Sequence, residues 1–250
     1  RTYRLESIGF ASGDLSVQSV AAEAVDASTN LSERTLLSYG AFLDYNYDGK
    51  YLVTGSIRRD QSSVFGRDNR DGVFWSTSLA WNLAEEDFMS GSDFDVLKLR
   101  ASAGVSGNQD GIGFYESLAV IGFGSFNSQT TAAPTDNGNP ALKFEENYTY
   151  DIGLEFTMFD DRLRGAIDYY EKVTSDLLLD RPLLSLGGEP DGSILSNVGE
   201  MENKGVEIEL DYDLIRTDDL YVNIAANLGT VKNKVTKLVP SSSYPEGAEI

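Results

Sequence analysis

Residues 148–158 read YTYDIGLEFTM, with an apolar or aromatic side chain at every second position. The even positions hold Tyr, Tyr, Ile, Leu, Phe and Met, whereas the odd positions hold Thr, Asp, Gly, Glu and Thr. A helix would spread the even positions around its whole circumference, but a strand places them all on one face. The segment therefore predicts a β-strand with one apolar and one polar face.

The same alternation recurs along most of the chain. Clear copies cover 37–47, 73–83, 97–105, 206–214 and 222–228, and noisier ones cover 51–59 and 163–172. The pattern predicts about eight strands of roughly ten residues each, which is the length that a tilted strand needs to cross a bilayer. No apolar run is long enough for a transmembrane helix.

The connections between these strands alternate in length. The tight ones lie at 48–50, 159–162 and 216–219, the intermediate one at 85–95, and the long ones at 61–72, 106–147 and 173–204. Gly49 supplies the positive φ that the first hairpin turn needs. In a meander, alternate connections lie at the same end, so one end carries turns and the other carries loops. The sequence predicts an all-β, antiparallel up-and-down meander that forms part of a large transmembrane β-barrel, with short periplasmic turns and long extracellular loops.

Aromatic residues near the expected strand ends agree with a membrane barrel. Tyr45, Tyr47 and Tyr51 flank the first turn, whereas Trp75 and Tyr148 lie beside long loops. Such residues form girdles at both membrane interfaces. The alternative is a soluble acidic β-sandwich that binds carbohydrate, in which the apolar stripes of two sheets would face each other. The need for detergent after membrane isolation would distinguish the two.

Composition excludes several classes of function. Lys and Arg total 20 and Asp and Glu total 40, so the net charge of −20 argues against a nucleic-acid partner. The chain has no Cys and no His, which removes thiolate metal sites, cysteine nucleophiles and the commonest general base. Residues 68–72 resemble a short calcium loop but lack the full ligand pattern, so a solvated turn is the better interpretation. We therefore expect no enzyme, no metal and no cofactor.

Several segments are individually recognisable and occur in a characteristic order. They are SIRRDQSSVFG at 56–66, WSTSLAW at 75–81, LKLRASAGVSGNQ at 97–109, NPALKFE at 139–145, YYEKVTSDLL at 169–178 and NVGEMENKGVE at 197–207. Together they resemble the SusC/RagA-like branch of the TonB-dependent transporters of Bacteroidetes. The resemblance covers nearly the whole chain and maps to the C-terminal half of the family's barrel.

The resemblance implies an outer-membrane protein that imports oligosaccharides or peptides with energy from the TonB system. Its implied partners are a SusD-like lipoprotein that covers the extracellular loops, the TonB complex acting through the plug, and outer-membrane lipid. The family's plug, TonB box, remaining strands and terminal aromatic strand have no counterpart here. We therefore expect residues 1–250 to be a partial barrel domain, because so few strands of a wide barrel cannot close by themselves.

The polar faces of the expected strands hold the candidate pathway residues. We expect Arg58, Asp60, Lys98, Arg100, Asp151 and Glu155 to face the lumen and to contact substrate, with Glu207, Glu209 and Asp211 as further members of the same face. The alternative is that they only keep a wet surface hydrated. Aromatic residues in the long loops could stack on sugars, or pack against the lid protein or one another; they are Phe114, Tyr115, Phe123 and Phe126.

Overall fold

The computed structural model describes residues 2–8, 23–30, 32–126, 129–183 and 192–238, which fall into two units, Arg1–Thr35 and Leu36–Ile250. In the first unit, β1 (Thr2–Ile8) pairs with β2 (Glu23–Asn30) in an antiparallel hairpin. Alternation did not predict these two strands. No helix in the described part of the chain is long and apolar enough to cross a membrane.

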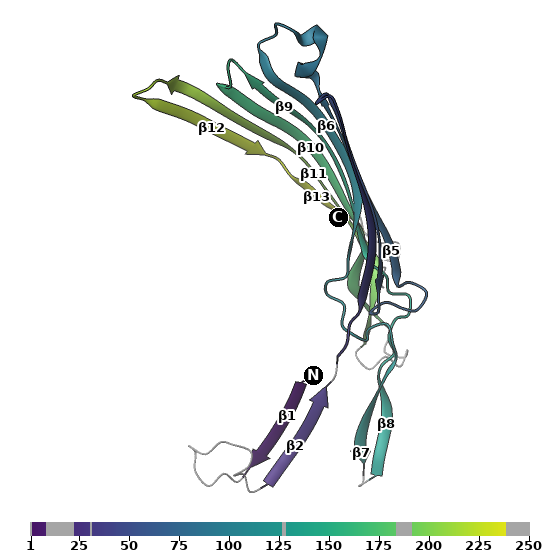
Figure 1. The fold of residues 1–250 in the computed structure, drawn as a ribbon. Helices are drawn as coiled ribbons and strands as arrows, with labels where there is room; N and C mark the ends of the chain where they lie inside the picture. Colours follow the sequence, from purple (N-terminus) through teal and green to yellow (C-terminus); the bar gives the residue numbers. More distant parts are fainter. Residues whose placement is uncertain (1, 9–22, 31, 127–128, 184–191, 239–250) are drawn as a thin grey trace. The chain divides into compact units, whose positions relative to one another are not determined.

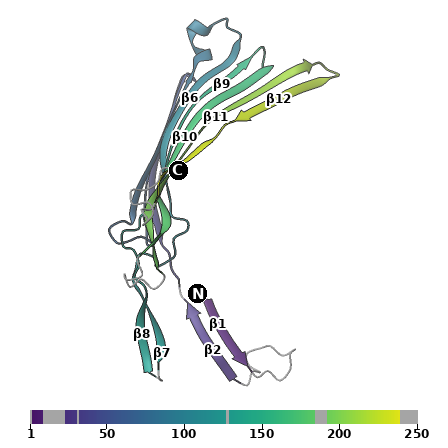
Figure 2. The ribbon, with the colours of Figure 1, turned by 180° about the vertical axis from the view of Figure 1, so that it is seen from behind.

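The second unit is built on one antiparallel sheet, and its strands lie side by side in both views of the ribbon (Figures 1 and 2). Its members are β3 (Leu36–Tyr47), β4 (Tyr51–Ser62), β5 (Asp71–Asn82), β6 (Phe94–Asn108), β9 (Glu145–Met158), β10 (Leu163–Pro182), β11 (Ser193–Arg216), β12 (Tyr221–Gly229) and β13 (Lys232–Lys237). The order is β3-β4-β5-β6-β9-β10-β11-β12, with β13 also on β11. All the strands predicted from the period of two are present.

β12 and β13 continue one another along β11. Glu207 pairs with Gly229, and Lys204 pairs with Lys232, so the register is unchanged across the interruption. The Thr230 amide donates to the Val206 carbonyl at 2.8 Å, which keeps the ladder closed between the two pieces. The sheet therefore has eight long strands in physical terms, as the sequence predicted.

The register brings the apolar positions of all eight strands onto one face. A single row crosses the whole sheet, and its members are Tyr47, Tyr51, Trp81, Leu99, Leu154, Ile167, Ile208 and Leu228. Many side chains of this face are exposed: Leu43 by 63%, Ile152 by 50% and Leu228 by 61%. In the described part of the second unit, the only other sheet is a two-stranded hairpin. The alternative of a two-layered sandwich is therefore wrong, because no second sheet among the described residues covers these rows.

The tight connections lie at the upper end of the sheet in Figure 1. In the first turn, Asp48 and Gly49 have φ of 55° and 68°, as a hairpin turn requires. The turn after β9 places Phe159, Asp160 and Asp161 at positive φ. The intermediate connection contains two short 3-10 helices, η2 (Leu83–Glu85) and η3 (Asp87–Met89).

Glu86 fixes this intermediate connection to the aromatic end of the apolar face. Its carboxylate accepts hydrogen bonds from the Tyr51 hydroxyl at 2.6 Å and the Trp81 indole N–H at 3.0 Å, and it pairs with the Lys50 ammonium at 3.4 Å. The rings of Tyr47, Tyr51 and Trp81 follow one another at centroid distances of 6.3 and 6.2 Å. The hydrogen bonds from Tyr51 and Trp81, together with the Lys50 charge, hold the pKa of Glu86 below its ordinary value.

This arrangement predicts that the local stability of the connection between β5 and β6 depends on pH. Because the pKa of Glu86 is lower in the folded chain, its contribution to stability is fully present above the ordinary pKa of 4.5 and is lost as the pH falls through the folded value. We expect hydrogen exchange in residues 83–90, corrected for intrinsic rates, to lose protection below about pH 4.5. In Glu86→Gln the protection should be weaker and independent of pH. A wild-type profile that stays flat between pH 3 and 7 would contradict this role.

The opposite end of the sheet is more ordered than the sequence predicted. The connection at 106–147 contains a hairpin of β7 (Val120–Phe126) and β8 (Gln129–Asp136). Most of 173–204, expected to be a long loop, instead extends β10 and β11. The prediction of a loop there was wrong because a bulge interrupts the alternation between Ser175 and Leu177, and Asp176 takes a φ of 56°.

A small hydrophobic cluster, here called the loop core, packs at this end. Its buried members are Val64, Phe65, Phe74, Val105, Ile112, Leu142 and Phe144. The rings of Phe65 and Phe74 lie 4.4 and 5.3 Å from that of Phe144. Gly66 passes so close to Pro140 that a Cβ would lie 1.7 Å from its carbonyl oxygen. The segments 56–66 and 139–145, which the sequence analysis singled out, thus pack against each other.

Polar contacts tie the same segment to the two longest strands. The Asn197 side chain both accepts from the Lys143 amide at 3.0 Å and donates to the Lys143 carbonyl at 2.9 Å. The Lys143 ammonium pairs with the Asp176 carboxylate at 2.6 Å. Glu145 accepts from the Leu178 amide at 2.7 Å. The loops are therefore anchored by hydrogen bonds as well as by apolar packing.

Candidate functional site

The six predicted pathway residues all lie on the face opposite the apolar rows. Lys98 pairs with Glu155, and Ser102 pairs with Asp151, across β6 and β9. Arg58 and Asp60 occupy the corresponding positions of β4, opposite Phe74 and Gly72. Because neighbouring residues of a strand point to opposite faces, the register places them together on what we call the polar face.

The structure divides these residues into two groups. Arg58 and Asp60 form one group near the loop core, where the Arg58 Nε donates to Asp60 at 2.9 Å and the guanidinium lies 5.9 Å from the centre of the Phe74 ring. Asp60 is only 5% exposed, so it orients Arg58 rather than presenting a free carboxylate. The other four belong to β6 and β9 and lie nearer the short turns.

Arg100 forms the strongest pairing of the second group. Its guanidinium donates to both carboxylate oxygens of Asp168, with Nη2 at 2.8 Å from each and Nε at 3.2 Å from Oδ1. Arg100 is on β6 and Asp168 on β10, so the pair spans β9 at Gly153, which lies between them in the register. A Cβ at Gly153 would lie 2.0 Å from the Asp168 oxygen, which explains why a glycine stands there.

A second arginine, Arg164, pairs with two aspartates of β11. Arg164 donates to Asp211 at 2.5 Å and to Asp213 at 3.1 Å. Asp213 also accepts from the Tyr221 hydroxyl at 2.5 Å and the Asn223 amide at 2.9 Å. These bonds fix the carboxylates of Asp211 and Asp213, two positions apart on β11, against the sheet.

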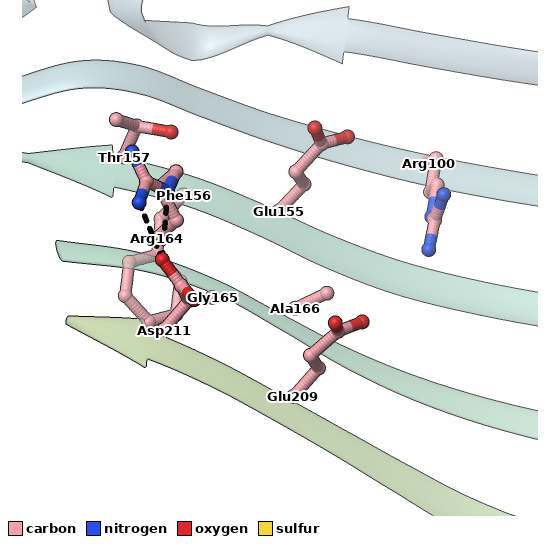
Figure 3. Close-up of a pocket in the computed structure, with 9 residues that line it drawn as sticks. All are labelled: Arg100, Glu155, Phe156, Thr157, Arg164, Gly165, Ala166, Glu209 and Asp211. Atoms are coloured by element: carbon pink, nitrogen blue, oxygen red, sulfur yellow. Dashed lines mark hydrogen bonds and ion pairs between the residues drawn. The ribbon is translucent and has the colours of Figure 1, made fainter. Parts of the chain in front are cut away.

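Between the two arginines lies a shallow depression of about 610 Å³, drawn in Figure 3. Its floor is Ala166, which pairs with Glu155 on one side and Glu209 on the other, and both carboxylates project from the same side of the sheet. Neither carboxylate forms a hydrogen bond or an ion pair with another described residue. The depression therefore offers two unpaired acceptors beside two fixed guanidinium groups, which suits hydrogen bonding to a polar molecule.

The remaining polar face is neutral where β4 and β5 meet. Hydroxyl pairs join Thr54 to Ser78 and Ser56 to Ser76, each at 2.6 Å. Among the described residues, no group of His, Cys, Asp or Glu is arranged to hold a metal ion. Residues 68–72 serve as the end of the β4–β5 connection and the start of β5, where the Asn69 amide donates to the Gly66 carbonyl.

Sequence reasoning missed Asp168, Arg164 and Asp213. A signal was present in the noisy segment 163–172, where Arg164, Ala166 and Asp168 alternate with Leu163, Gly165 and Ile167. Their pairing could not be foreseen, because it joins residues that are distant in sequence, on adjacent strands for Arg164 with Asp213 and across an intervening strand for Arg100 with Asp168. Among the loop aromatics, Phe114, Tyr115 and Phe123 are exposed by 46%, 42% and 79%, whereas the side chain of Phe126 lies outside the described residues.

The model of the family described as TonB dependent receptor-like, beta-barrel, matches residues 4–246. The chain belongs to this TonB-dependent receptor family. TonB-dependent receptor P3 of Formosa agariphila is 38% identical over 219 residues, which are 84% of this chain and 21% of that protein. TonB-dependent receptor SusC of Bacteroides thetaiotaomicron is 34% identical over 219 residues, which are 83% of this chain and 21% of that protein.

Solved structures agree with this assignment. The RagAB peptide importer in its closed-closed state superposes with a TM-score of 0.81 and 28% identity, over 91% of this chain and 25% of that one. The resemblance to the SusC/RagA branch and the outer-membrane location are thereby confirmed. TonB-dependent receptors are transporters, so the prediction that the chain is not an enzyme is also confirmed. The chain spans about a fifth of the length of its curated relatives.

Proposed function

We propose that this chain is part of the barrel wall of an outer-membrane importer that takes up oligosaccharides or peptides with energy from the TonB system. The observation that carries the proposal is the two-sided sheet, with exposed apolar rows on one face and paired charges on the other. The apolar face would meet lipid and the polar face would line the lumen. In this proposal residues 1–250 form one partial barrel domain, including the β1–β2 hairpin.

The partners follow from the same family membership. A SusD-like lipoprotein would rest on the long loops, and TonB would act through a plug that belongs to another part of the whole protein. The loop core supports this assignment, because its members Ile112 and Leu142 pack the segments on either side of the β7–β8 hairpin. The solved relative is named as a peptide importer, which supports a peptide substrate, and the oligosaccharide class is proposed from the resemblance to the SusC/RagA-like branch.

Within the wall, we propose that the depression around Ala166 is one point where substrate is held during passage. Glu155 and Glu209 would accept hydrogen bonds from hydroxyl or amide groups, while Arg100 and Arg164 stay committed to their aspartates. Arg58, oriented by Asp60, would donate hydrogen bonds to substrate nearer the loops. Asp60, Lys98 and Asp151 would set the charge of the pathway.

Uptake measurements test this role. In the full-length transporter, the double change Glu155→Gln and Glu209→Gln is expected to weaken the apparent affinity for substrate about tenfold, since a hydrogen bond to a charged group contributes about 1.5–3 kcal/mol. Cells would be given labelled oligosaccharide or peptide, with and without an intact TonB system. Glu85→Gln, on the exposed turn side, is the matched control. Unchanged uptake by the double variant at equal surface abundance would contradict the subsite, whereas uptake independent of TonB would contradict the transport proposal.

A further inference from the structure

Phe42 departs from the polar character of the face on which it stands. On β3 its neighbours on that face are Gly40 and Asp44, whereas Ala41 and Leu43 belong to the apolar face. Phe42 is 80% exposed, which is more than any other large hydrophobic side chain among the described residues. The alternation of the strand fixes the side of the sheet that carries the ring, whatever pairs with the other edge of β3.

An arginine lies beside this ring. Arg58 pairs with Gly40 in the register of β3 and β4. A Cβ at Gly40 would lie 3.7 Å from Cε2 of the Phe42 ring and 3.8 Å from Cγ of Arg58, so both side chains border the same point. The Arg58 Nε donates to Asp60, and neither Nη atom forms a hydrogen bond with another described residue. The N–H groups of both Nη atoms therefore remain available to a ligand.

Hydroxyl groups and a buried ring complete a pocket around Phe42. Phe42 pairs directly with Ser56, whose hydroxyl oxygen is 2.6 Å from that of Ser76. One hydrogen lies between the two oxygens, so this hydroxyl pair keeps one free O–H donor and free acceptor lone pairs. With Arg58 and Phe74, these residues line a pocket of about 200 Å³. Phe74 is buried in the loop core, which gives the pocket a fixed wall.

The size of the pocket and its chemistry favour one kind of ligand. Sites for drug-sized molecules have about 300–1,000 Å³, so this pocket suits a single unit of a longer chain. A sugar ring can cover Phe42 with its C–H face while the hydroxyls at its edge reach Ser56 and Arg58. An apolar peptide side chain on the ring would instead cover the Ser56 hydroxyl without replacing its bonds to water, which costs free energy.

The surrounding charges favour a neutral sugar over an acidic one. Asp60 already neutralises the Arg58 guanidinium through their ion pair. Asp44 lies two residues from Phe42 on the same face of β3 and would repel a carboxylate or sulfate group. The pocket therefore offers hydrogen bonds to a ligand without offering a net positive charge.

We propose that Phe42, together with Arg58 and Ser56, forms a stacking site for one neutral sugar ring of an oligosaccharide. This inference rests on the proposed function, in which the polar face lines the lumen, and it selects oligosaccharides as the substrate class. Phe42 supplies the flat apolar surface, and the arginine and the serine supply the hydrogen bonds. Every neutral pyranose presents such a C–H face and a rim of hydroxyls, so the site favours sugars over peptides without selecting one particular sugar.

Equilibrium binding to the full-length protein in detergent tests the site. The probes are an array of labelled neutral hexasaccharides and a matched set of labelled hexapeptides. We expect at least one hexasaccharide to bind, and Phe42→Ala to weaken that binding about tenfold because the ring face is lost. Phe42→Trp keeps a flat ring and should bind within about threefold of the wild type, whereas Phe42→Leu should lose most of the affinity that Phe42→Ala loses.

Leu43→Ala is the matched control. It removes the next side chain of the same strand, which is 63% exposed on the apolar face, and should leave binding unchanged. Because the Phe42 side chain is 80% exposed, Phe42→Ala should also unfold at the same denaturant concentration as the wild type. A loss of binding in that variant therefore reports the site and not the fold.

Four results would overturn the proposal. They are the absence of binding by every neutral hexasaccharide, equal binding by the wild type and Phe42→Ala, an equal loss in Leu43→Ala, and binding of peptides alone that depends on Phe42. The last result would assign the pocket to a peptide. TonB-dependent uptake is measured separately, so failure of the sugar site leaves the transport proposal in place.

Discussion

Replacing Phe65 with alanine is expected to destabilise the loop core by about 3–5 kcal/mol, because it leaves a cavity that the neighbouring rings cannot fill. Phe65 is fully buried, and its ring lies 4.4 Å from that of Phe144. The strands themselves should persist, because their ladder does not depend on this side chain. The measurement is denaturant-induced unfolding of the full-length protein, followed by hydrogen exchange in residues 63–70 and 139–145.

Phe123→Ala is the matched control for this experiment. It removes the same atoms from a side chain that is 79% exposed, so its effect should stay within about 0.5 kcal/mol. If both variants lose equal protection, the loop core does not hold the loops as the packing indicates. If the Phe65 variant alone loses protection and also imports more slowly, the loop core contributes to seating the lid.

Replacing Ile152 with arginine is expected to cost about 2–4 kcal/mol when the protein is folded in a bilayer, because the charge would face hydrocarbon near the middle of the apolar rows. Ile152 lies between Ala101 and Tyr169 in the register and is 50% exposed. Reversible unfolding from phospholipid vesicles, with protease resistance as the readout, gives the free energy of unfolding.

The preceding residue provides the control. Asp151→Arg introduces the same side chain one position away, on the polar face, and is expected to change stability by less than about 1 kcal/mol. A larger loss for Asp151→Arg than for Ile152→Arg would reverse the assignment of the two faces. That outcome would overturn the lumen-facing role of the polar residues.

Strand positions could be predicted well from sequence, and the reason is physical. A wall with water on one side and hydrocarbon on the other forces each strand to alternate, so residues 148–158 and 206–214 show their faces directly. The same alternation occurs in sandwiches, so membrane placement depended on loop lengths and on motifs. The register across eight strands then joined the alternating positions into continuous rows.

Features that depend on tertiary contacts could not be predicted. The close approach of Gly66 to Pro140 leaves no room for a Cβ at residue 66, and nothing in either segment alone indicates its partner. The bulge at Asp176 shifts the alternation of β10, so its second half resembled a loop. The partner of Arg100 is Asp168, two strands away in the sheet, which no local pattern indicates.

The clamp from Arg100 across Gly153 to Asp168 also has a mechanical consequence. Backbone hydrogen bonds join each strand only to its immediate neighbours. This ion pair instead links β6 directly to β10 across β9. We therefore expect β6, β9 and β10 to move together as one rigid part of the sheet. Bending of the sheet would then concentrate in the region of β3 to β5, where the cross-strand side-chain bonds on the polar face are hydroxyl pairs between immediate neighbours.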